Sequence, residues 1–401
     1  MSYYLLLVLG SLATISALYS IRLGKEYERK VRETLSRQRF RFSPPTCLIL
    51  ACKGDEPGLA KNIGAMVQQD YNDYRTIIVT DTEQDPAHKV AESVIARYPN
   101  VKANVITSTA HNQASGKVAA LLTALEESGG EAEVYAFIDS DALVHPSWLK
   151  ELVDPLSDPS IGATTGFRWY FPTHNGFWSH VQAAWNASGS SLLFNDKYNF
   201  PWGGAMAVRA DTLRKIKIEQ VWEKAVSDDL SLNSALRNFG YRISFIPQCT
   251  VATFSNITFT SFMRWTTNQI TLVRAYHRPL WNYALVAYGF FNTSFVLGFI
   301  SLIIALWFGP FWLIPASLLL LPTPLGIFGS KIRLGAFKQA IPDLKSEFER
   351  TSRGDYIASL IVPWVMTYSI FKSTFTNEIE WRGRRYRLIG ANESATSRSI
   401  P

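Results

Sequence analysis

Two long apolar runs stand apart from the rest of the chain. Residues 1–21 contain no charged side chain, and the 52 residues from Pro279 to Ser330 contain no Asp, Glu, Lys, Arg or His. A helix needs about 20 apolar residues to cross a bilayer. The first run therefore predicts one membrane-spanning helix, and the second predicts two helices with a turn at Trp307-Phe-Gly-Pro310.

The first run is typical of a membrane anchor and not of a cleaved signal peptide. A signal peptide begins with basic residues and ends at a cleavage site of small residues. Residues 1–21 have no basic beginning and continue directly into Arg22. We therefore expect an uncleaved N-terminal anchor.

A third apolar run, from Tyr356 to Phe371, holds only 16 residues and includes Pro363. Basic residues collect on the cytoplasmic side of membrane helices. Eight basic and three acidic residues lie between Arg22 and Arg41, so the segment after the first anchor is expected in the cytoplasm. A full fourth span would move the arginine-rich tail to the other side. The prediction for 356–371 is therefore a re-entrant or interfacial element.

The segment between the apolar runs, residues 42–278, alternates two kinds of pattern. Short β-branched runs at 46–51, 76–80 and 134–138 predict buried strands, and the stretches at 58–69, 87–97 and 116–127 predict helices. This alternation is typical of an α/β domain with an open, mostly parallel sheet and helices on its faces.

Composition narrows the class further. Charged residues make up 18% and hydrophobic residues 47%, with a mean hydropathy of +0.01, which excludes a disordered, collagen-like or disulfide-stapled chain.

The net charge is 40 − 33 = +7. Basic clusters adjoin apolar runs, including the cluster Arg382, Arg384, Arg385 and Arg387. This placement indicates juxtamembrane anchoring at a lipid bilayer and no nucleic-acid partner. Three cysteines without zinc spacing indicate a reducing compartment.

Acidic residues follow two of the predicted strands. Asp81 comes after the second strand, and Asp139-Ser-Asp141 after the third. Ligands of open α/β sheets bind outside the carboxyl ends of the strands. Carboxylates placed there suit a divalent cation, Mg²⁺ or Mn²⁺, that also holds a diphosphate. Lys117 is a candidate phosphate contact, and a solvated lysine at a helix start is an equal alternative.

Two later segments carry further candidate chemistry. Gly203 and Gly204 would let a ligand approach the backbone closely, although a bulge or tight turn explains them equally well. Asp228 and Asp229 open a predicted helix that runs through Phe239. One of them is expected to cap the helix, which leaves the other for general-base catalysis.

Together these motifs resemble the membrane-bound family 2 glycosyltransferases, in particular the ceramide glucosyltransferase-like branch. The similarity runs from about residue 45 to 390. Besides the residues above it includes Lys53-Gly-Asp-Glu-Pro-Gly-Leu59, Asn62, Gln69-Asp-Tyr71, Asp85-Pro-Ala87, Arg264-Trp265 and the tail Trp381-Arg-Gly-Arg-Arg-Tyr-Arg387.

The resemblance implies an α/β fold of the GT-A type, a nucleotide-sugar domain with transmembrane helices at both ends. The implied segments are an anchor at 1–21, a catalytic domain at 42–255, an interfacial helix at 256–278, two spans at 279–330, and a cytoplasmic loop with a short apolar element and basic tail at 331–401.

The resemblance also implies roles for matching residues. Asp81 would contact the nucleotide base, and Asp139 and Asp141 would bind the metal and diphosphate, with Asp141 the direct ligand. Asp229 would be the base of an inverting transfer. The remaining implied donor-binding residues are Lys117, Gly203, Gly204, Arg264 and Trp265.

The motif that closes over the substrates departs from the family pattern. Ser261 stands where the family has Gln or Arg, and serine is too short for the same contact. Gln269, one helical turn past Trp265, is a candidate substitute.

The leading hypothesis is an enzyme that moves a hexose from a UDP-sugar to a lipid hydroxyl at the cytoplasmic membrane face, with a ceramide-like acceptor first. Diacylglycerol and hopanoid-type lipids are further candidate acceptors. Two competing hypotheses are a processive polysaccharide synthase and an inactive membrane scaffold of the same fold.

Overall fold

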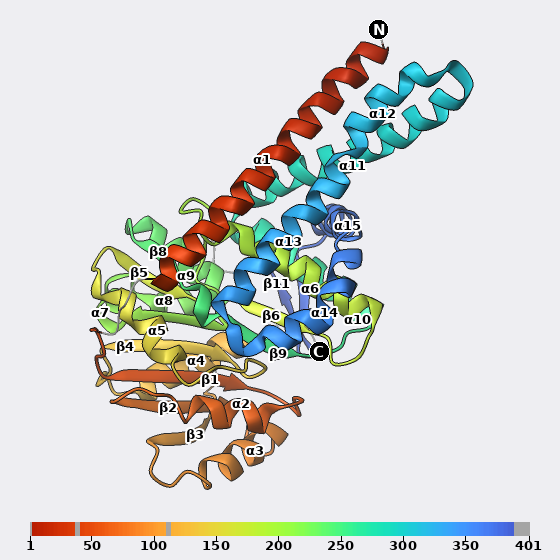
Figure 1. Ribbon diagram of the computed structural model, residues 1–401. Coiled ribbons are helices and arrows are strands. Elements are labelled where there is room, and N and C mark those ends of the chain that lie inside the picture. Colours follow the sequence, from red (N-terminus) through yellow and green to blue (C-terminus); the bar gives the residue numbers. More distant parts are fainter. Residues whose placement is uncertain (1, 37–40, 110–113, 389–401) are drawn as a thin grey trace.

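The computed structural model describes residues 2–36, 41–109 and 114–388, and its centre is a seven-stranded sheet (Figure 1). The strand order is β3-β2-β1-β4-β7-β5-β8. The strands are β1 Thr46–Cys52, β2 Tyr74–Thr80, β3 Ala103–Thr107, β4 Val134–Asp139, β5 Ile161–Thr165, β7 Ala205–Arg209 and β8 Arg242–Phe245. Neighbouring strands pair in parallel except at β7, which runs antiparallel to both β4 and β5. The predicted mostly parallel sheet is confirmed.

Helices cover both faces of this sheet because its inner strands are apolar on both faces. Along β1, Leu48 and Leu50 join one core cluster, while Cys47 and Ile49 join another. The first cluster includes residues of α2 Leu59–Met66, α3 Pro86–Ile95 and α5 Trp148–Val153. The second includes residues of α4 Gly116–Glu127, α7 Ala210–Lys215, α8 Ile218–Trp222 and α9 Asp228–Asn238. Continuous apolar strands of this kind are typical of buried parallel sheets.

Two smaller sheets complete the soluble part. Strands β6 Arg168–Phe171 and β9 Val251–Phe254 pair in parallel, and β10 Glu378–Trp381 and β11 Arg384–Arg387 form an antiparallel hairpin. The β6–β9 pair lies against α6 Phe177–Gly189 and a cluster that includes Tyr27, Phe337 and Phe348. The soluble domain is thereby packed onto the membrane helices.

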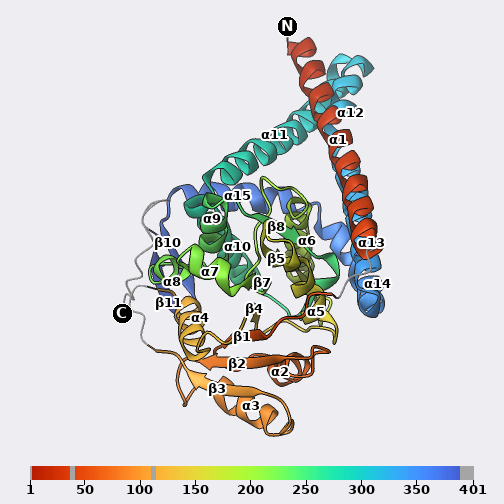
Figure 2. The same ribbon diagram turned by 90° about the vertical axis from the view of Figure 1, so that its left-hand side faces the viewer.

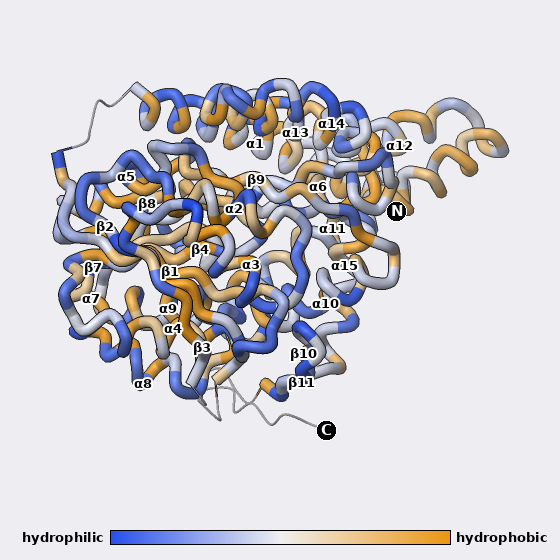
Figure 3. The backbone as a smooth tube through the Cα atoms, turned by 90° about the horizontal axis from the view of Figure 1, so that it is seen from below, coloured by the Kyte–Doolittle hydropathy of each residue, from blue (hydrophilic) through white to orange (hydrophobic). Residues whose placement is uncertain are grey.

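Three helices are long and apolar enough to cross a membrane, spanning Tyr3–Ser36, Arg278–Phe308 and Pro310–Ala340. They comprise α1 Ser2–Ser36, α11 Arg278–Phe308, and the pair α12 Leu313–Leu320 and α13 Pro322–Ala340. Helix α1 lies along α13, whereas α11 diverges from both (Figure 2). The protruding ends of α11 and α12 are mainly hydrophobic (Figure 3). Transmembrane helices at both ends of the chain are therefore confirmed.

The remaining helices lie between the spans and the sheet. They are α10 Phe259–Tyr276, α14 Lys345–Ala358 and α15 Val362–Thr374, and α10 packs on α15. Within the described residues, α15 is not among the helices that could span a membrane. A re-entrant or interfacial role for 356–371 stays a prediction.

Candidate active site

The topology of the sheet brings the acidic residues together. Asp81 follows β2, and Asp139 is the last residue of β4, which is separated from β2 by the single strand β1. Because β7 runs antiparallel to β4, its first residues lie beside the last residues of β4, and Ala205 pairs with Ile138. Gly203 and Gly204 directly precede β7, and the Asp139 amide donates to the Gly204 carbonyl at 3.4 Å. One edge of the sheet therefore holds both the carboxylates and the glycines.

Lys117, on the first turn of α4, links two of the acidic motifs. Its Nζ lies 2.7 Å from Asp139 Oδ1 and 3.0 Å from Asp228 Oδ2, and it donates to the Gly203 carbonyl at 3.3 Å. Burial disfavours the Lys117 charge, but Asp139 and Asp228 outweigh it and raise the pKa of Lys117. The alternative of a solvated lysine is wrong, because Lys117 is the central cation of the cluster.

Arg168, the first residue of β6, is a second cation at this edge. Its guanidinium bonds Asp141 through Nη1 at 2.8 Å and Nη2 at 2.7 Å, and Asp139 through Nη2 at 2.6 Å. Burial raises the pKa of Asp139, but Lys117 and Arg168 outweigh it and hold that pKa below its usual value. At Asp141 burial prevails over Arg168, and the pKa is raised. The sequence prediction missed Arg168, although a lone arginine in the aromatic run Phe167–Phe171 already signals a buried ion pair.

The two glycines make room for side chains of this chain. A Cβ at Gly203 would overlap Asp228 Oδ2, and a Cβ at Gly204 would overlap the ring of Trp202. Neither has positive φ. Close approach is therefore the reason for both glycines, and the groups that approach are the carboxylate and the indole of the site itself.

Asp228 and Asp229 take different positions at the start of α9. Ser227 is the N-cap, and its hydroxyl accepts from Leu230 N–H, so the prediction that one of the two aspartates is the cap is wrong. Asp228 is buried against Lys117, whereas Asp229 Oδ1 accepts from the Ser227 hydroxyl and, at 2.7 Å, from Leu230 N–H. Asp229 Oδ2 has only a long contact, 3.4 Å, with Gly203 N–H among the described residues. Asp229 thus has one oxygen fixed and one oxygen available.

The C-terminal hairpin reaches back to the same edge of the sheet. Arg384 donates to Asp81 Oδ2 at 2.8 Å, and Lys53 lies 2.6 Å from the same oxygen. Arg382 pairs with Glu56. The interpretation of Arg382 and Arg384 as juxtamembrane anchors is wrong, because both arginines face acidic residues of the soluble domain.

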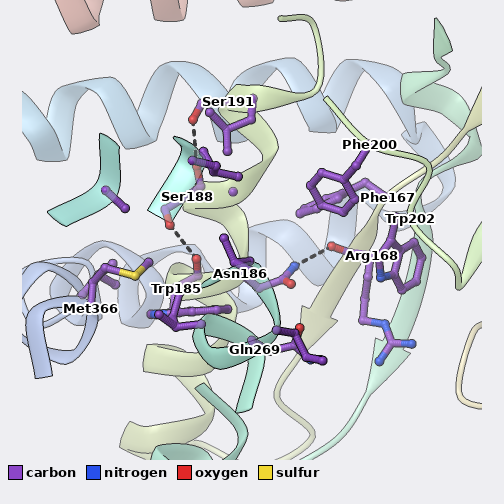
Figure 4. Close-up of a pocket in the computed structure, with 18 of the residues that line it drawn as sticks. Phe167, Arg168, Trp185, Asn186, Ser188, Ser191, Phe200, Trp202, Gln269 and Met366 are labelled. Carbon is purple, nitrogen blue, oxygen red and sulfur yellow. Dashed lines mark hydrogen bonds between the residues drawn. The ribbon is translucent and has the colours of Figure 1, made fainter. Parts of the chain in front are cut away.

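The predicted closing motif is divided between two places. Trp265 packs edge-on against Trp185 and Tyr170, with ring centroids 4.9 and 5.8 Å apart. Arg264 instead pairs with Glu380 of the hairpin at 3.2 Å. The Ser261 hydroxyl accepts a hydrogen bond from the Thr258 hydroxyl at 3.1 Å, whereas Gln269 lines the central cavity near Trp185 and Arg168 (Figure 4). Trp265 and Gln269 therefore face the cavity, and Arg264 contacts the hairpin.

A cavity of about 1480 Å³ joins this cluster to the membrane helices. At one end it is lined by Asp81, Lys117, Asp139, Asp141 and Asp229, and at the other by residues of α1, α11, α13 and α15. Tyr19, Phe290, Gly326 and Trp364 are examples of the second group. Figure 4 shows part of this cavity, where Phe200 and Trp202 lie on one side and Trp185 and Met366 on the other.

Comparison with known sequences identifies the family. The profile described as Glycosyl transferase family 21 matches residues 5–393. The chain belongs to glycosyl transferase family 21. The resemblance to the ceramide glucosyltransferase-like branch is confirmed at the level of the family.

Two curated relatives match parts of this family 21 chain. It is 27% identical over 136 residues to a ceramide glucosyltransferase of Komagataella phaffii, covering 32% of this chain and 26% of that protein. It is 21% identical over 179 residues to the glycosyltransferase AglE of Haloferax volcanii, covering 44% of this chain and 47% of that protein. The matches thus span about a quarter and about half of these relatives' lengths.

The fold of the family 21 chain is similar to that of the mannosyltransferase PcManGT from Pyrobaculum calidifontis, solved with GDP-Man and Mn²⁺. The TM-score is 0.51 at 15% identity, covering 92% of this chain and 99% of that chain. The predicted GT-A-type fold is confirmed.

The carboxylates of the family 21 site would complete the coordination of a divalent metal only together with oxygen ligands from a substrate. Within residues 2–36, 41–109 and 114–388, no group of three or more His, Cys, Asp or Glu side chains could hold a metal ion. Asp139 and Asp141 nevertheless supply carboxylate oxygens of the kind that Mg²⁺ and Mn²⁺ prefer, and such ions commonly share two carboxylates with substrate phosphates. The residues fit a metal that arrives with a diphosphate.

Proposed function

We propose that this protein is an inverting hexosyltransferase that moves a hexose from a UDP-sugar to the hydroxyl of a membrane lipid, with a ceramide-like lipid as the first-choice acceptor. The observation that carries the proposal is the single cavity that begins at the carboxylate cluster and continues between the membrane helices. A charged nucleotide-sugar suits the first end, and apolar lipid chains suit the second. The relatives named a ceramide glucosyltransferase and a mannosyltransferase support the same class of reaction.

Asp229 is the proposed catalytic base. Its Oδ1 is held by the Ser227 hydroxyl and by Leu230 N–H, which fixes the carboxylate, while Oδ2 keeps only the long contact with Gly203 N–H, and both residues line the cavity. In an inverting transfer Oδ2 would accept the proton of the lipid hydroxyl as that oxygen attacks the anomeric carbon. A base needs to be ionised and oriented for this step.

The other end of the site is proposed to hold the donor. Asp81 would contact the nucleotide base, and Lys117 would meet the diphosphate from the start of α4, where backbone N–H groups also favour anions. Asp139 and Asp141 would hold Mg²⁺ or Mn²⁺, as the carboxylate chemistry allows. When bound, such a metal neutralises the charge that develops on the leaving diphosphate.

The catalytic domain is proposed to face the cytoplasm. Basic residues lie at the ends of the spans nearest the soluble domain, as Lys25, Lys30, Lys331 and Lys338 illustrate. Positive residues flank membrane helices on the cytoplasmic side. Cytoplasmic UDP-sugars would then have direct access to the carboxylate end of the cavity.

The test is a matrix of UDP-sugars against lipid acceptors with the detergent-solubilised protein, read by product mass. The proposal expects one hexose added to one lipid, with ceramide-like acceptors preferred over diacylglycerol and hopanoid-type lipids. A polymeric product would indicate a processive synthase. Absence of product from every pair would favour the inactive scaffold.

A further inference from the structure

Arg168 occupies the carboxylate pair on which the proposed metal site depends. Its guanidinium bonds Asp139 Oδ2 at 2.6 Å and both oxygens of Asp141 at 2.7 and 2.8 Å. The fourth oxygen of the pair, Asp139 Oδ1, lies 2.7 Å from Lys117 Nζ. All four carboxylate oxygens therefore already have a cationic partner.

The surroundings hold Arg168 firmly in this position. Its side chain is only 12% exposed. The guanidinium lies 4.7 Å from the centre of the Trp202 ring and 5.3 Å from that of Tyr170, and it also donates to the Tyr170 hydroxyl at 2.9 Å. Cation–π contacts of this kind strengthen when they are shielded from water. Arg168 is therefore a buried, well-packed residue of the site.

A divalent cation at these oxygens would compete with the guanidinium. Magnesium binds oxygen ligands at about 2.0–2.1 Å, so its charge would lie close to that of Arg168, and the two cations would repel each other. Binding of the metal at Asp139 and Asp141 therefore favours withdrawal of Arg168.

We propose that Arg168 is a resident counter-cation that competes with the divalent metal for Asp139 and Asp141 and yields to the metal only when a nucleotide diphosphate binds with it. The inference rests on the metal site of the proposed function. A diphosphate contributes negative charge and further oxygen ligands, which offset the loss of the Arg168 bonds. Metal and nucleotide are then positively coupled, as any pair of ligands is when one removes a competing state for the other.

The aromatic rings give the displaced guanidinium a place to stay. Trp202 and Tyr170 lie against Arg168 independently of its bonds to the carboxylates, and all three line the cavity. Arg168 can therefore remain in the site as a positioning residue that faces the anionic donor.

The test measures binding of Mn²⁺ alone to the full-length protein, by electron paramagnetic resonance of the free ion, without nucleotide. Arg168→Gln should tighten Mn²⁺ binding by about tenfold or more, in the range typical of coupled sites. Arg382→Gln is the matched control. Arg382 acts on both carboxylates through its charge but bonds Glu56, so its removal should change affinity by less than about threefold.

Adding UDP completes the experiment. UDP should tighten Mn²⁺ binding by about tenfold in the wild-type protein and much less in Arg168→Gln, because the competitor is already gone. The double variant Arg168→Gln with Asp141→Asn should lose the tightened site, which would place the ion at the pair.

Equal or weaker Mn²⁺ affinity in Arg168→Gln, or no Mn²⁺ binding in it at all, would overturn the inference. If the glutamine variant does not fold, Arg168→Lys replaces it, because lysine keeps the positive charge but lacks the planar guanidinium that bonds a carboxylate bidentately. Arg168→Lys should tighten Mn²⁺ binding to a smaller extent. Unchanged Mn²⁺ affinity in this variant would count against the inference. Tighter Mn²⁺ binding in a protein that transfers no hexose would leave this inference standing and overturn the proposed function alone.

Discussion

Lys117 Nζ lies 3.0 Å from Asp228 Oδ2, in a site where Asp228 is only 6% exposed. Burial raises the pKa of Asp228 to about 6, and Asp229 and Asp139 add to the rise while Lys117 opposes it. Near neutral pH the protein thus keeps a costly ionised carboxylate in place, because Lys117 pairs with it. This pair connects α4 to the start of α9, where the proposed base lies.

The pH dependence of stability follows from this raised pKa. Between about pH 4 and pH 6 the folded protein retains a proton on Asp228 that the unfolded chain has lost, so stability from this group is present below pH 4 and decreases as the pH rises through 6. The decrease amounts to at most about 3 kcal/mol. Asp228→Asn lacks this titration. Melting temperatures of both proteins in detergent from pH 4 to 8 test it: the difference, wild type minus variant, should fall up to about pH 6 and then level off. A constant difference would contradict the assignment.

Gly203→Ala should damage the site by steric conflict. The added Cβ would overlap Asp228 Oδ2 and approach Lys117 Nζ to 3.1 Å. Overpacking of a filled site costs about 1–3 kcal/mol, so we expect a lower melting temperature and at least about tenfold lower transfer.

Gly189→Ala is the matched control for this substitution. Gly189 also lines the cavity, yet a Cβ there has no atom within 4 Å. Its melting temperature and activity should stay close to those of the wild type. Similar losses in both variants would show that the crowding at Gly203 is not the cause.

Much of this arrangement can be predicted from residues that are local in the sequence. The strands at 46–51, 76–80 and 134–138 are visible as apolar runs, and Asp139-Ser-Asp141 at a strand end predicts a site at the edge of the sheet. The membrane-spanning helices can be predicted because a run of 52 residues without a charged side chain is typical of such helices.

The cationic half of the site is less accessible from sequence. Arg168 and Asp141 are 27 positions apart, and Arg384 and Asp81 are 303 apart. A charge beside an apolar run has the same local pattern whether it faces lipid headgroups or a carboxylate. Only the tertiary fold decides between the two, which is why the sequence pattern wrongly predicts an anchor at Arg384.

Arg384 is expected to matter for the donor because it bonds Asp81 and packs over Gly116 at the start of α4. Arg384→Gln should raise the KM for the UDP-sugar by about fivefold to tenfold, which corresponds to about 1 kcal/mol, the order of one net hydrogen bond. Arg387→Gln, an exposed arginine on the same strand, is the control and should leave KM within about twofold. An equal rise in KM in the two variants would show that the effect comes from the loss of one positive charge on the strand and not from the Arg384–Asp81 contact.

The proposed lipid end of the cavity can be blocked separately. Gly326 of α13 lines it, and a Cβ added at Gly326 would meet no atom within 4 Å. Gly326→Phe should therefore prevent lipid entry and reduce transfer by about tenfold or more while UDP-sugar binding is kept. Gly289→Phe on α11 is the control, since Gly289 has equally open surroundings and is not part of the described cavity lining. Assays of transfer and of donor binding together decide the matter. Full transfer in Gly326→Phe would contradict the proposed lipid path.

The central claim is that Asp229 directs an inverting transfer of one hexose onto a lipid hydroxyl. The most direct measurement is the mass and anomeric configuration of the product formed from UDP-glucose and ceramide by the wild type and by Asp229→Asn. We predict one hexosyl residue with the configuration opposite to that of the donor. We predict no detectable product from Asp229→Asn, a loss of at least about 10³-fold, with UDP-glucose binding retained. A product of retained configuration, or wild-type turnover by Asp229→Asn, would contradict the claim.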